Sequence, residues 1–266
     1  MLRPRIIPCL LVRNKGLVKT VGFREGKYVG DPINAVRIFN EKEADELMVL
    51  DIDASAKGLG PDMKMIQFWA AECRMPLCYG GGVTTVAQAR AIIGLGVEKV
   101  AVSAAAIARP QLVAEIAAEV GSQSVVVVLD VRKTRDGRYE IQTHNGTRAT
   151  GLCPVAQARR FQELGVGEIV VNAIDRDGEM RGYDMELAAR VREATTVPMT
   201  VLGGAGKLSD ISDLVGRCGV VGAAAGSLFV FKGTYKAVLI NYPGPEIKDR
   251  LLRGALGLGG RIQGST

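Results

Sequence analysis

The sequence predicts a closed (β/α)8 TIM barrel built from two similar half-barrels. Three observations predict it. The chain has 266 residues, close to the roughly 250 of a single barrel. Short apolar strand patterns alternate with helical patterns, and several segments recur about 120 residues apart. Hydrophobic residues make up 47% and aromatic residues only 5%, which favours aliphatic packing between a parallel sheet and helices.

The first half of the chain predicts four strand–helix units. Its strands are expected at 5–12, 46–51, 77–79 and 99–103, and its helices at 32–42, 64–73, 85–94 and from 109–110 onward. Asp31 is the expected N-cap of the first helix, with Pro32 just inside it. Thr84 or Thr85 caps the third. The stretch 13–31, rich in Lys and Gly, is interpreted as a polar loop.

The second half predicts four more units. Its strands are expected at 125–132, 168–172, 199–202 and 220–224, and its helices at 154–164, 184–193, 208–215 and 235–240. Asp136-Gly137 predicts a small hairpin inside the long loop 133–151. The glycine-rich stretch 254–266 is expected to be a flexible tail, so that the barrel spans 1–253.

The strand at 125–132 organises the prediction because it is apolar until Asp130, where it ends. A carboxylate at the end of a buried parallel strand lies where a barrel keeps its chemistry. Asp130-Val131-Arg132 repeats Leu11-Val12-Arg13 of the first half, and 76–82 is repeated by 199–205. The duplication therefore places Leu11 where the second half has its acid.

Composition argues against several classes of function. The net charge is +6, but Lys and Arg are spread along the chain without a dense run, which argues against nucleic-acid binding. The five cysteines show no CxxC spacing and His144 is the one histidine, so no metal, cofactor or Cys/His pair is expected. No signal peptide or membrane span is predicted, and a cytoplasmic protein is expected.

Other residues receive structural interpretations. Trp69 is expected to pack a helix on the barrel, Tyr183 to line the mouth or anchor a loop, and His144 to lie on the surface. The cysteines are interpreted as core residues.

Glycine-rich strand ends that open helices bind anions, since free N–H groups and the helix dipole face the ligand. The sequence has such ends at 80–82 and 203–206, each followed by a small-residue turn after the next strand. Their equivalent places in the two halves predict an elongated ligand with a phosphate at each end.

Four charges occupy the opposite ends of apolar strands: Arg5, Glu46, Lys99 and Glu168. They are either solvated residues before unrelated strands or a set of paired charges inside the barrel.

From Arg5 to about Ile240 the chain resembles the cyclase subunit of imidazole glycerol phosphate synthase (HisF). The resemblance is carried by the segments RIIPCL, GLVK, ADEL, YGGGV, GVEKV, RATG, ELGVGEIVVNAIDRDG, RGYD and LGGAG. The resemblance implies a HisH-like glutaminase docked at the N-terminal face of the barrel. Ammonia would pass through the barrel to a bis-phosphorylated substrate at the mouth. It makes Arg5, Glu46, Lys99 and Glu168 an ammonia gate, and implies substrate or phosphate contacts at Lys19, Gly82, Ser103, Asp177, Gly178, Gly204, Gly226 and Ser227, with a flexible loop around Lys19.

The chain departs from that pattern at its acids. The family uses two facing aspartates as acid and base, whereas this chain keeps Asp130 and has Leu11 at the other position. Ser103 replaces the usual Asn, and Asn14 and Asp53 also differ. These departures resemble a paralogous branch that works with a HisH-like glutaminase and a separate sugar amidotransferase on O-antigen acetamidino sugars. A phosphorylated sugar or nucleotide sugar is the substrate that this resemblance implies.

Two other functions stay open. The chain could be an ordinary histidine-pathway cyclase in which Asp51 or Asp53 replaces the lost acid, or a non-catalytic scaffold that stimulates the glutaminase. The related barrel isomerase of the same pathway is disfavoured because it has no need of the charged gate.

Overall fold

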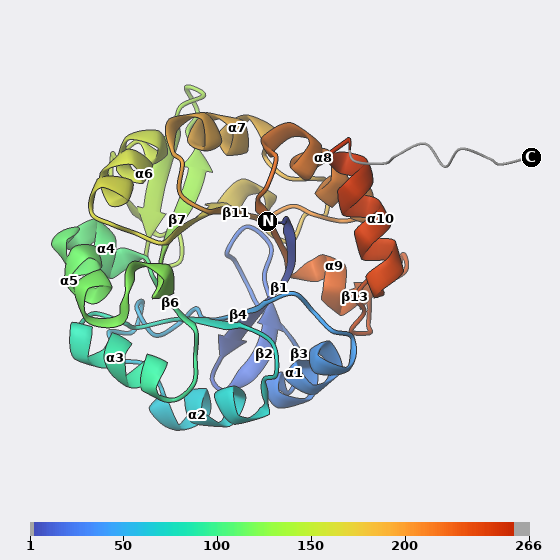
Figure 1. Cartoon of the computed structure of the whole chain (residues 1–266), viewed down its shortest axis with the longest axis horizontal. Helices are drawn as coiled ribbons and strands as arrows, with labels where there is room; N and C mark the ends of the chain where they lie inside the picture. The colour runs from blue at the N-terminus through green and yellow to red at the C-terminus, as the bar shows by residue number, and fades with distance from the viewer. Residues whose placement is uncertain (1–2, 258–266) are drawn as a thin grey trace, which may run out of the picture.

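The computed structural model describes residues 3–257 and contains a closed barrel of eight parallel strands (Figure 1). Its strands are β1 (Arg5–Arg13), β4 (Leu47–Asp51), β5 (Leu77–Gly80), β6 (Lys99–Val102), β7 (Val125–Lys133), β10 (Glu168–Ala173), β11 (Met199–Leu202) and β12 (Gly222–Ala225). Pairing of β10 with β7 joins the two halves on one side, and pairing of β12 with β1 closes the sheet. The predicted (β/α)8 barrel is confirmed.

Helices surround the barrel. They are α1 (Pro32–Glu41), α2 (Met63–Glu72), α3 (Val86–Gly94), α4 (Ala104–Ala108), α5 (Gln111–Val120), α6 (Pro154–Glu163), α7 (Met185–Ala194), α8 (Leu208–Cys218), α9 (Ser227–Val230) and α10 (Pro245–Ala255), with 3-10 turns η1 (Ser122–Ser124) and η2 (Ile174–Arg176). Asp31 caps α1 as predicted, accepting the N–H of Ile33 at 2.8 Å. Thr85, rather than Thr84, caps α3 in a reciprocal pair with Gln88.

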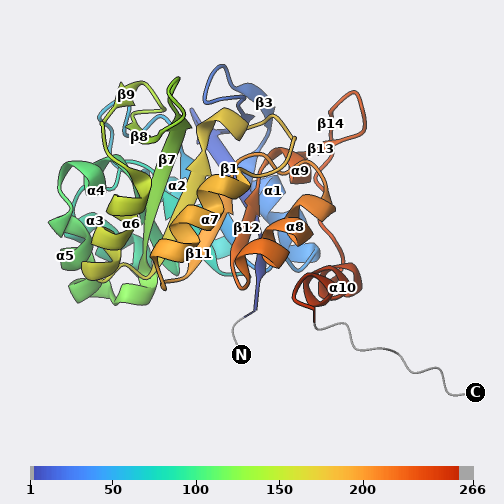
Figure 2. The same ribbon diagram turned by 90° about the horizontal axis from the view of Figure 1, so that it is seen from above.

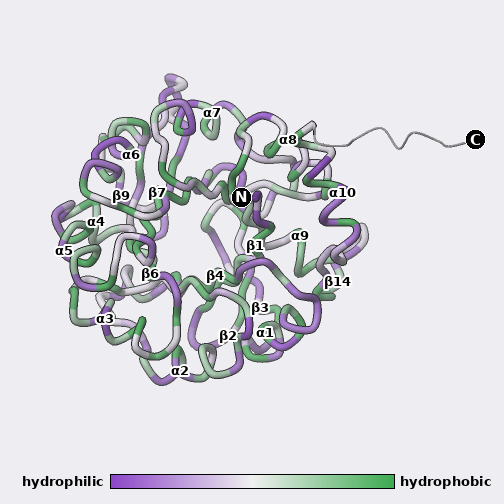
Figure 3. Tube along the Cα trace, in the orientation of Figure 1, coloured by the Kyte–Doolittle hydropathy of each residue, from purple (hydrophilic) through white to green (hydrophobic). Residues whose placement is uncertain are grey.

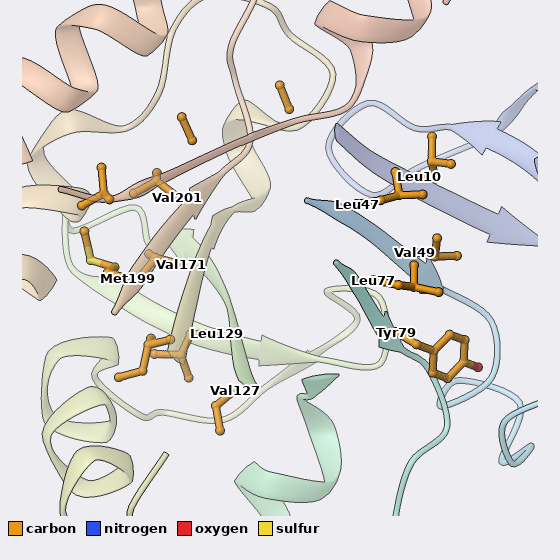
Figure 4. Packing of buried hydrophobic residues seen from close by; sticks show 14 of the residues in the cluster. Leu10, Leu47, Val49, Leu77, Tyr79, Val127, Leu129, Val171, Met199 and Val201 are labelled. Atoms are coloured by element: carbon orange, nitrogen blue, oxygen red, sulfur yellow. The ribbon is translucent and has the colours of Figure 1, made fainter. Parts of the chain in front are cut away.

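The strands bury two separate hydrophobic cores because alternate side chains face opposite sides of a sheet. On β1, Ile7 and Cys9 belong to the inner core that fills the barrel, together with Met48, Val128 and others. The larger core lies between strands and helices; Figure 4 shows ten of its residues, Leu10, Leu47, Val49, Leu77, Tyr79, Val127, Leu129, Val171, Met199 and Val201. The strands are accordingly mostly hydrophobic along the tube in Figure 3.

The stretch 13–31 is not a simple loop. It contains β2 (Gly16–Lys19) and β3 (Lys27–Gly30), which extend β1 as antiparallel strands. Asn14 and Lys15 form the turn with positive φ angles of 48° and 65°, the geometry that suits a two-residue hairpin. The hairpin predicted in 133–151 is confirmed as β8 (Tyr139–Thr143), which pairs with β7, and β9 (Arg148–Ala149) pairs with β8.

The last predicted helix, 235–240, is wrong. Gly233, at φ 73°, turns the chain between β13 (Phe231–Lys232) and β14 (Ala237–Val238), so this segment is a hairpin. The final helix is α10, which Pro245 opens. It runs through Gly254, where the flexible tail was expected to start, and the part of that tail from 258 to 266 lies outside the described residues.

The two ends of the barrel differ (Figure 2). The hairpins β2–β3, β8–β9 and β13–β14 rise at the end to which the parallel strands point, which we call the mouth. At the opposite end, the base, the strands begin and α10 lies beside them. No helix within residues 3–257 is long and apolar enough to span a membrane.

Substitution of Gly222 can test how tightly the base of the barrel is packed. A Cβ atom there would lie 1.9 Å from Oγ1 of Thr200, whereas one at Gly94 on α3 would meet nothing within 4 Å. We expect Gly222→Ala to lower the free energy of unfolding by about 1–3 kcal/mol through overpacking. Gly94→Ala should leave it unchanged or slightly higher. Urea unfolding of both variants checks this, and equal stabilities would show that the base tolerates extra volume.

Candidate functional site

The four charges at the base form a closed ring of ion pairs, which we call the ion-pair ring (Arg5, Glu46, Lys99 and Glu168). Nη2 of Arg5 lies 2.8 Å from Oε1 of Glu168, and Nη1 of Arg5 contacts Glu46. Nζ of Lys99 lies 2.8 Å from a carboxylate oxygen of Glu46 and 2.8 Å from one of Glu168. Each cation thus bridges both acids, and the ring carries no net charge.

The ion-pair ring is deep enough for its charges to depend on one another. The side chains of Glu46 and Glu168 are only 3% and 4% exposed, so the interpretation as solvated charges is excluded. Burial alone would lower the pKa of Lys99, but Glu168 and Glu46 raise it above its usual value. The hydroxyl of Thr200 donates to Glu168 at 2.5 Å and satisfies a further acceptor.

The mouth holds a cavity that both half-barrels line. The residues for which substrate or phosphate contacts were expected lie in its wall, together with Asp130 and Leu11: Lys19, Gly82, Ser103, Asp177, Gly178, Gly204, Gly226 and Ser227. The glycine-rich turns after β5 and β11 lie in that wall, as do the turns after β6 and β12. The structure therefore brings the expected mouth residues together and holds the ion-pair ring at the other end.

Asp130 lies in the cavity wall within β7, which continues to Lys133 rather than ending at this acid as expected. Its Oδ1 accepts a hydrogen bond from Nδ2 of Asn172 at 2.8 Å, and its Oδ2 accepts a longer one from Ser103 at 3.4 Å. Burial raises the pKa of Asp130 to about 6, although those two hydrogen bonds act in the opposite direction. A carboxyl group with that pKa can both accept and donate a proton near neutral pH. Oδ1 of Asn172 is buried without a hydrogen-bond partner among residues 3–257, so it is available to a ligand donor.

The wall opposite Asp130 carries no equivalent acid. Leu11 is on β1, four strands from β7 around the barrel, and packs against the inner core. Asp51 lines the cavity, but its Oδ1 accepts the backbone N–H groups of Asp53 and Ala54. Asp53 lies outside the cavity lining and is ion-paired with Arg13 and Lys57. Asp53 is thus held away from the cavity, whereas Asp51 is tied to its own turn through Oδ1 and lies on β4 rather than at the position of Leu11.

Lys19 is not on the exposed loop that was expected. It ends β2, is buried, and donates through Nζ to the carbonyl oxygen of Cys9 at 2.7 Å. Burial lowers the pKa of Lys19, while Asp177 acts to raise it. A Cβ at Gly226 would approach Nζ to 2.4 Å, so this ammonium lies directly beside the turn after β12. Asp177 accepts from the Thr20 hydroxyl at 2.6 Å and ties this hairpin to the far wall.

Sequence reasoning missed several lining residues. His144 and Asn145 follow β8 and lie in the cavity wall, where both are partly exposed, so His144 is at the surface as expected but faces the mouth. Asn172 lies near the carboxyl end of the buried strand β10, in register with Asp130 on β7, and a polar residue ending an apolar run could have pointed to it. Tyr183 is a loop anchor whose hydroxyl donates to the Ala224 carbonyl at 3.0 Å, and Trp69 is buried against Tyr79 as expected. Cys153 is exposed and is therefore not a core residue.

Comparison with known proteins gives consistent results. The family model described as "Histidine biosynthesis protein" matches residues 5–236. The chain is 56% identical over 252 residues to the "Putative imidazole glycerol phosphate synthase subunit HisF" of Leptospira interrogans, covering 94% of this chain and 99% of that protein. It is 56% identical over 253 residues to the "Putative imidazole glycerol phosphate synthase subunit hisF3" of Vibrio vulnificus (strain YJ016), covering 95% and 97%. Identity is 40% over 229 residues, 86% and 91% of the two chains, to the "Imidazole glycerol phosphate synthase subunit HisF" of Alkaliphilus metalliredigens (strain QYMF).

The charge balance of the ion-pair ring can be tested by a double-mutant cycle. Lys99→Met leaves two buried carboxylates with one cation, and we expect it to lower the free energy of unfolding by about 3–5 kcal/mol. Adding Glu46→Gln to that variant restores a neutral set, so the double variant should be more stable than Lys99→Met alone. Chemical unfolding of the two single variants and the double variant measures the coupling. Strictly additive losses would mean that the four charges act independently.

The raised pKa of Asp130 predicts a pH-dependent stability. Its folded pKa of about 6 exceeds the usual value of 3.8, so its favourable contribution is full below pH 3.8 and is lost as pH rises through 6. Asp130→Asn removes this titration. We expect the stability of the variant relative to the parent chain to increase by about 1–2 kcal/mol between pH 4.5 and 7.5. Thermal melts at both pH values check this; a constant difference would place the carboxyl in a water-like environment.

Proposed function

Because the chain belongs to the histidine biosynthesis protein family and is a HisF-like subunit, we propose that it receives ammonia from a HisH-like glutaminase through its barrel. The ammonia is used to aminate a phosphorylated sugar or nucleotide sugar, for acetamidino modification of lipopolysaccharide O-antigen. A separate sugar amidotransferase completes the reaction. The single observation that carries the proposal is a combination: the ion-pair ring is complete, while Leu11 lines the mouth at the position where the resemblance to HisF implies the second acid.

The base supports the ammonia half of the proposal. The ion-pair ring lies where the barrel strands begin, with Arg5 and Lys99 both partly exposed and both acids buried behind them. Four mutually paired charges cost desolvation energy that an apolar plug of the same size would not. A glutaminase docked at this face would release ammonia directly onto the ring. Arg5, Glu46, Lys99 and Glu168 then act as the gate through which a small neutral nucleophile enters.

The mouth supports a reaction other than the histidine-pathway cyclisation. An acid and a base that share the proton transfers of a reaction must both be titratable, and leucine has no titratable group. Asp130, with its pKa raised by burial, is the proton-transfer group that stays. Because Asp51 caps a turn and Asp53 holds two cations, the alternative in which one of them restores an ordinary cyclase is disfavoured.

The glycine-rich turns supply the substrate contacts of the proposal. Gly82 and Ser103 line one side of the cavity, while Gly178, Gly204, Gly226 and Ser227 line the other with Lys19 and Asp177. Backbone N–H groups at such turns suit phosphoryl oxygens. A non-catalytic scaffold would need neither a titratable Asp130 nor two lined walls, so the scaffold alternative is less well supported.

The proposal is tested by deleting the gene in the organism that encodes it. The deletion strain should still grow without histidine, and mass spectrometry should show O-antigen that lacks the amidino group. Complementation with the Lys99→Met variant should restore less modification than the parent gene when ammonium is scarce, and as much when ammonium is abundant. A histidine requirement in the deletion strain would contradict the proposal and favour the cyclase.

A second test uses the assembled complex. Adding the chain to its HisH-like glutaminase should raise the rate of glutamine hydrolysis, since the partner is proposed to dock at the base. The variant Arg13→Gln changes the mouth and leaves the base intact, so it should still form the complex. A glutaminase that neither binds the chain nor responds to it would contradict the ammonia route.

A further inference from the structure

Arg13 is a cation of the mouth cavity that has no part in the proposed function. Arg13 ends β1 and lines the mouth cavity. It lies on the same strand face as Cys9 and Leu11, which also line that cavity, because alternate residues of a strand share a face. Its guanidinium is therefore the next side chain above the position of the missing acid, and it is 29% exposed.

The guanidinium of Arg13 is held from one side and open on the other. Its Nε donates to Oδ1 of Asp53 at 3.0 Å. Neither Nη atom is hydrogen-bonded to any residue within 3–257. Nη1 lies close to Gly26, where an added Cβ would approach it to 3.0 Å. The side chain is thus fixed through Nε on the cavity wall, with Nη1 beside Gly26 and Nη2 without a hydrogen-bond partner within residues 3–257, which leaves guanidinium donors for phosphoryl oxygens.

Asp53 is in turn fixed by a second cation. Nζ of Lys57 lies 2.7 Å from Oδ2 of Asp53, and Lys57 also donates to Oδ1 of Asn14 at 3.3 Å. Hydrogen bonds from Lys57 and Arg13 hold the pKa of Asp53 below its usual value, against the effect of burial. Asp53 is thus held between two cations, and Arg13 is the one of these two that lines the cavity. Asn14 and Asp53 are two of the positions at which this chain departs from the histidine enzymes that it resembles.

The repeat supplies an internal comparison. Arg132 is the equivalent of Arg13 in the second half, and it too lies beside an aspartate, with Nε 3.7 Å from Asp175. However, Nη1 of Arg132 donates to the carbonyl oxygen of Gly146 at 3.1 Å, and Arg132 does not line the cavity. The two halves therefore use the same residue differently. Of these two arginines, only Arg13 lines the mouth cavity.

We propose that Arg13 forms an anion subsite on the β1 wall of the mouth, and that this subsite binds a phosphoryl group of the substrate. Asp53 is its positioning residue. The subsite rests on the proposed function in that it specifies the phosphorylated substrate of the same cavity. A phosphoryl group bound there sits above Leu11, on the side of the mouth opposite Asp130. In this proposal the β1 wall of the mouth carries a cation that binds the substrate and has no acid that transfers protons.

The test measures binding of pyrophosphate to the full-length chain by calorimetry at fixed ionic strength, with no glutaminase or glutamine present. We expect Arg13→Gln to raise Kd about tenfold, because it removes a charge-assisted pair of hydrogen bonds. Arg13→Lys should raise Kd by a smaller factor, since it keeps the charge and loses the planar donors. The matched control Arg132→Gln should change Kd less than about twofold, because its guanidinium faces the backbone.

Three results would overturn the subsite: unchanged affinity in Arg13→Gln, equal losses in Arg13→Gln and Arg132→Gln, or displacement of pyrophosphate by acetate at equal concentration. Thermal melts establish that each variant is folded. If Arg13→Gln does not fold, Arg13→Lys decides, and unchanged affinity in that variant overturns the proposal. Because the assay contains no glutaminase, its failure leaves the ammonia route standing, and failure of the ammonia route leaves the phosphoryl subsite measurable.

Discussion

The structure depends on a ring of opposite charges that is buried at one end of an otherwise apolar barrel. Two glutamates 3% and 4% exposed cannot stay ionised unless both cations stay within ion-pairing distance. The need to pair these charges fixes the register of the strands that carry the four residues, since a shift by one residue would turn the charged side chains to the helix side. It also explains the tight packing of Gly222 against Thr200, whose hydroxyl satisfies Glu168.

Strand periodicity connects this base to the mouth. The inner face of β1 carries Arg5, Ile7, Cys9, Leu11 and Arg13 in succession, so one strand presents the base charge, the apolar lumen and both altered mouth positions. Change at the mouth therefore need not disturb the base. Substitution at Leu11 alters the proton chemistry opposite Asp130, while Arg5, six residues earlier on the same strand, keeps its place between two acids. The proposed combination of an ammonia entrance at the base with an altered mouth is therefore physically possible in this fold.

Much of this arrangement could be predicted from sequence. Apolar strands ending in Asp130 or in glycine pairs set both the barrel and the mouth, because the carboxyl ends of parallel strands meet at one face. The pairing of the base charges was left open because strand pairing alone does not say which side chains reach one another. The place of His144 in the cavity wall was missed because it depends on how the β8–β9 hairpin packs at the mouth. Segment 235–240 failed because a helical pattern across one short turn is weaker than the glycine turn at Gly233. The different surroundings of Arg13 and Arg132 could not be predicted, since the two arginines occupy equivalent places in the repeat and their side-chain partners are set by tertiary contacts.

The central claim is that this HisF-like barrel has kept its ammonia entrance and lost the acid pair of the histidine-pathway cyclase. The most direct measurement is the rate at which the purified chain forms imidazole glycerol phosphate with saturating ammonium, so that no glutaminase is needed. The Alkaliphilus metalliredigens HisF subunit, 40% identical, is the reference. The account predicts a rate at least about 100-fold below that reference, because one member of an acid–base pair is missing. A rate comparable to the reference would contradict it.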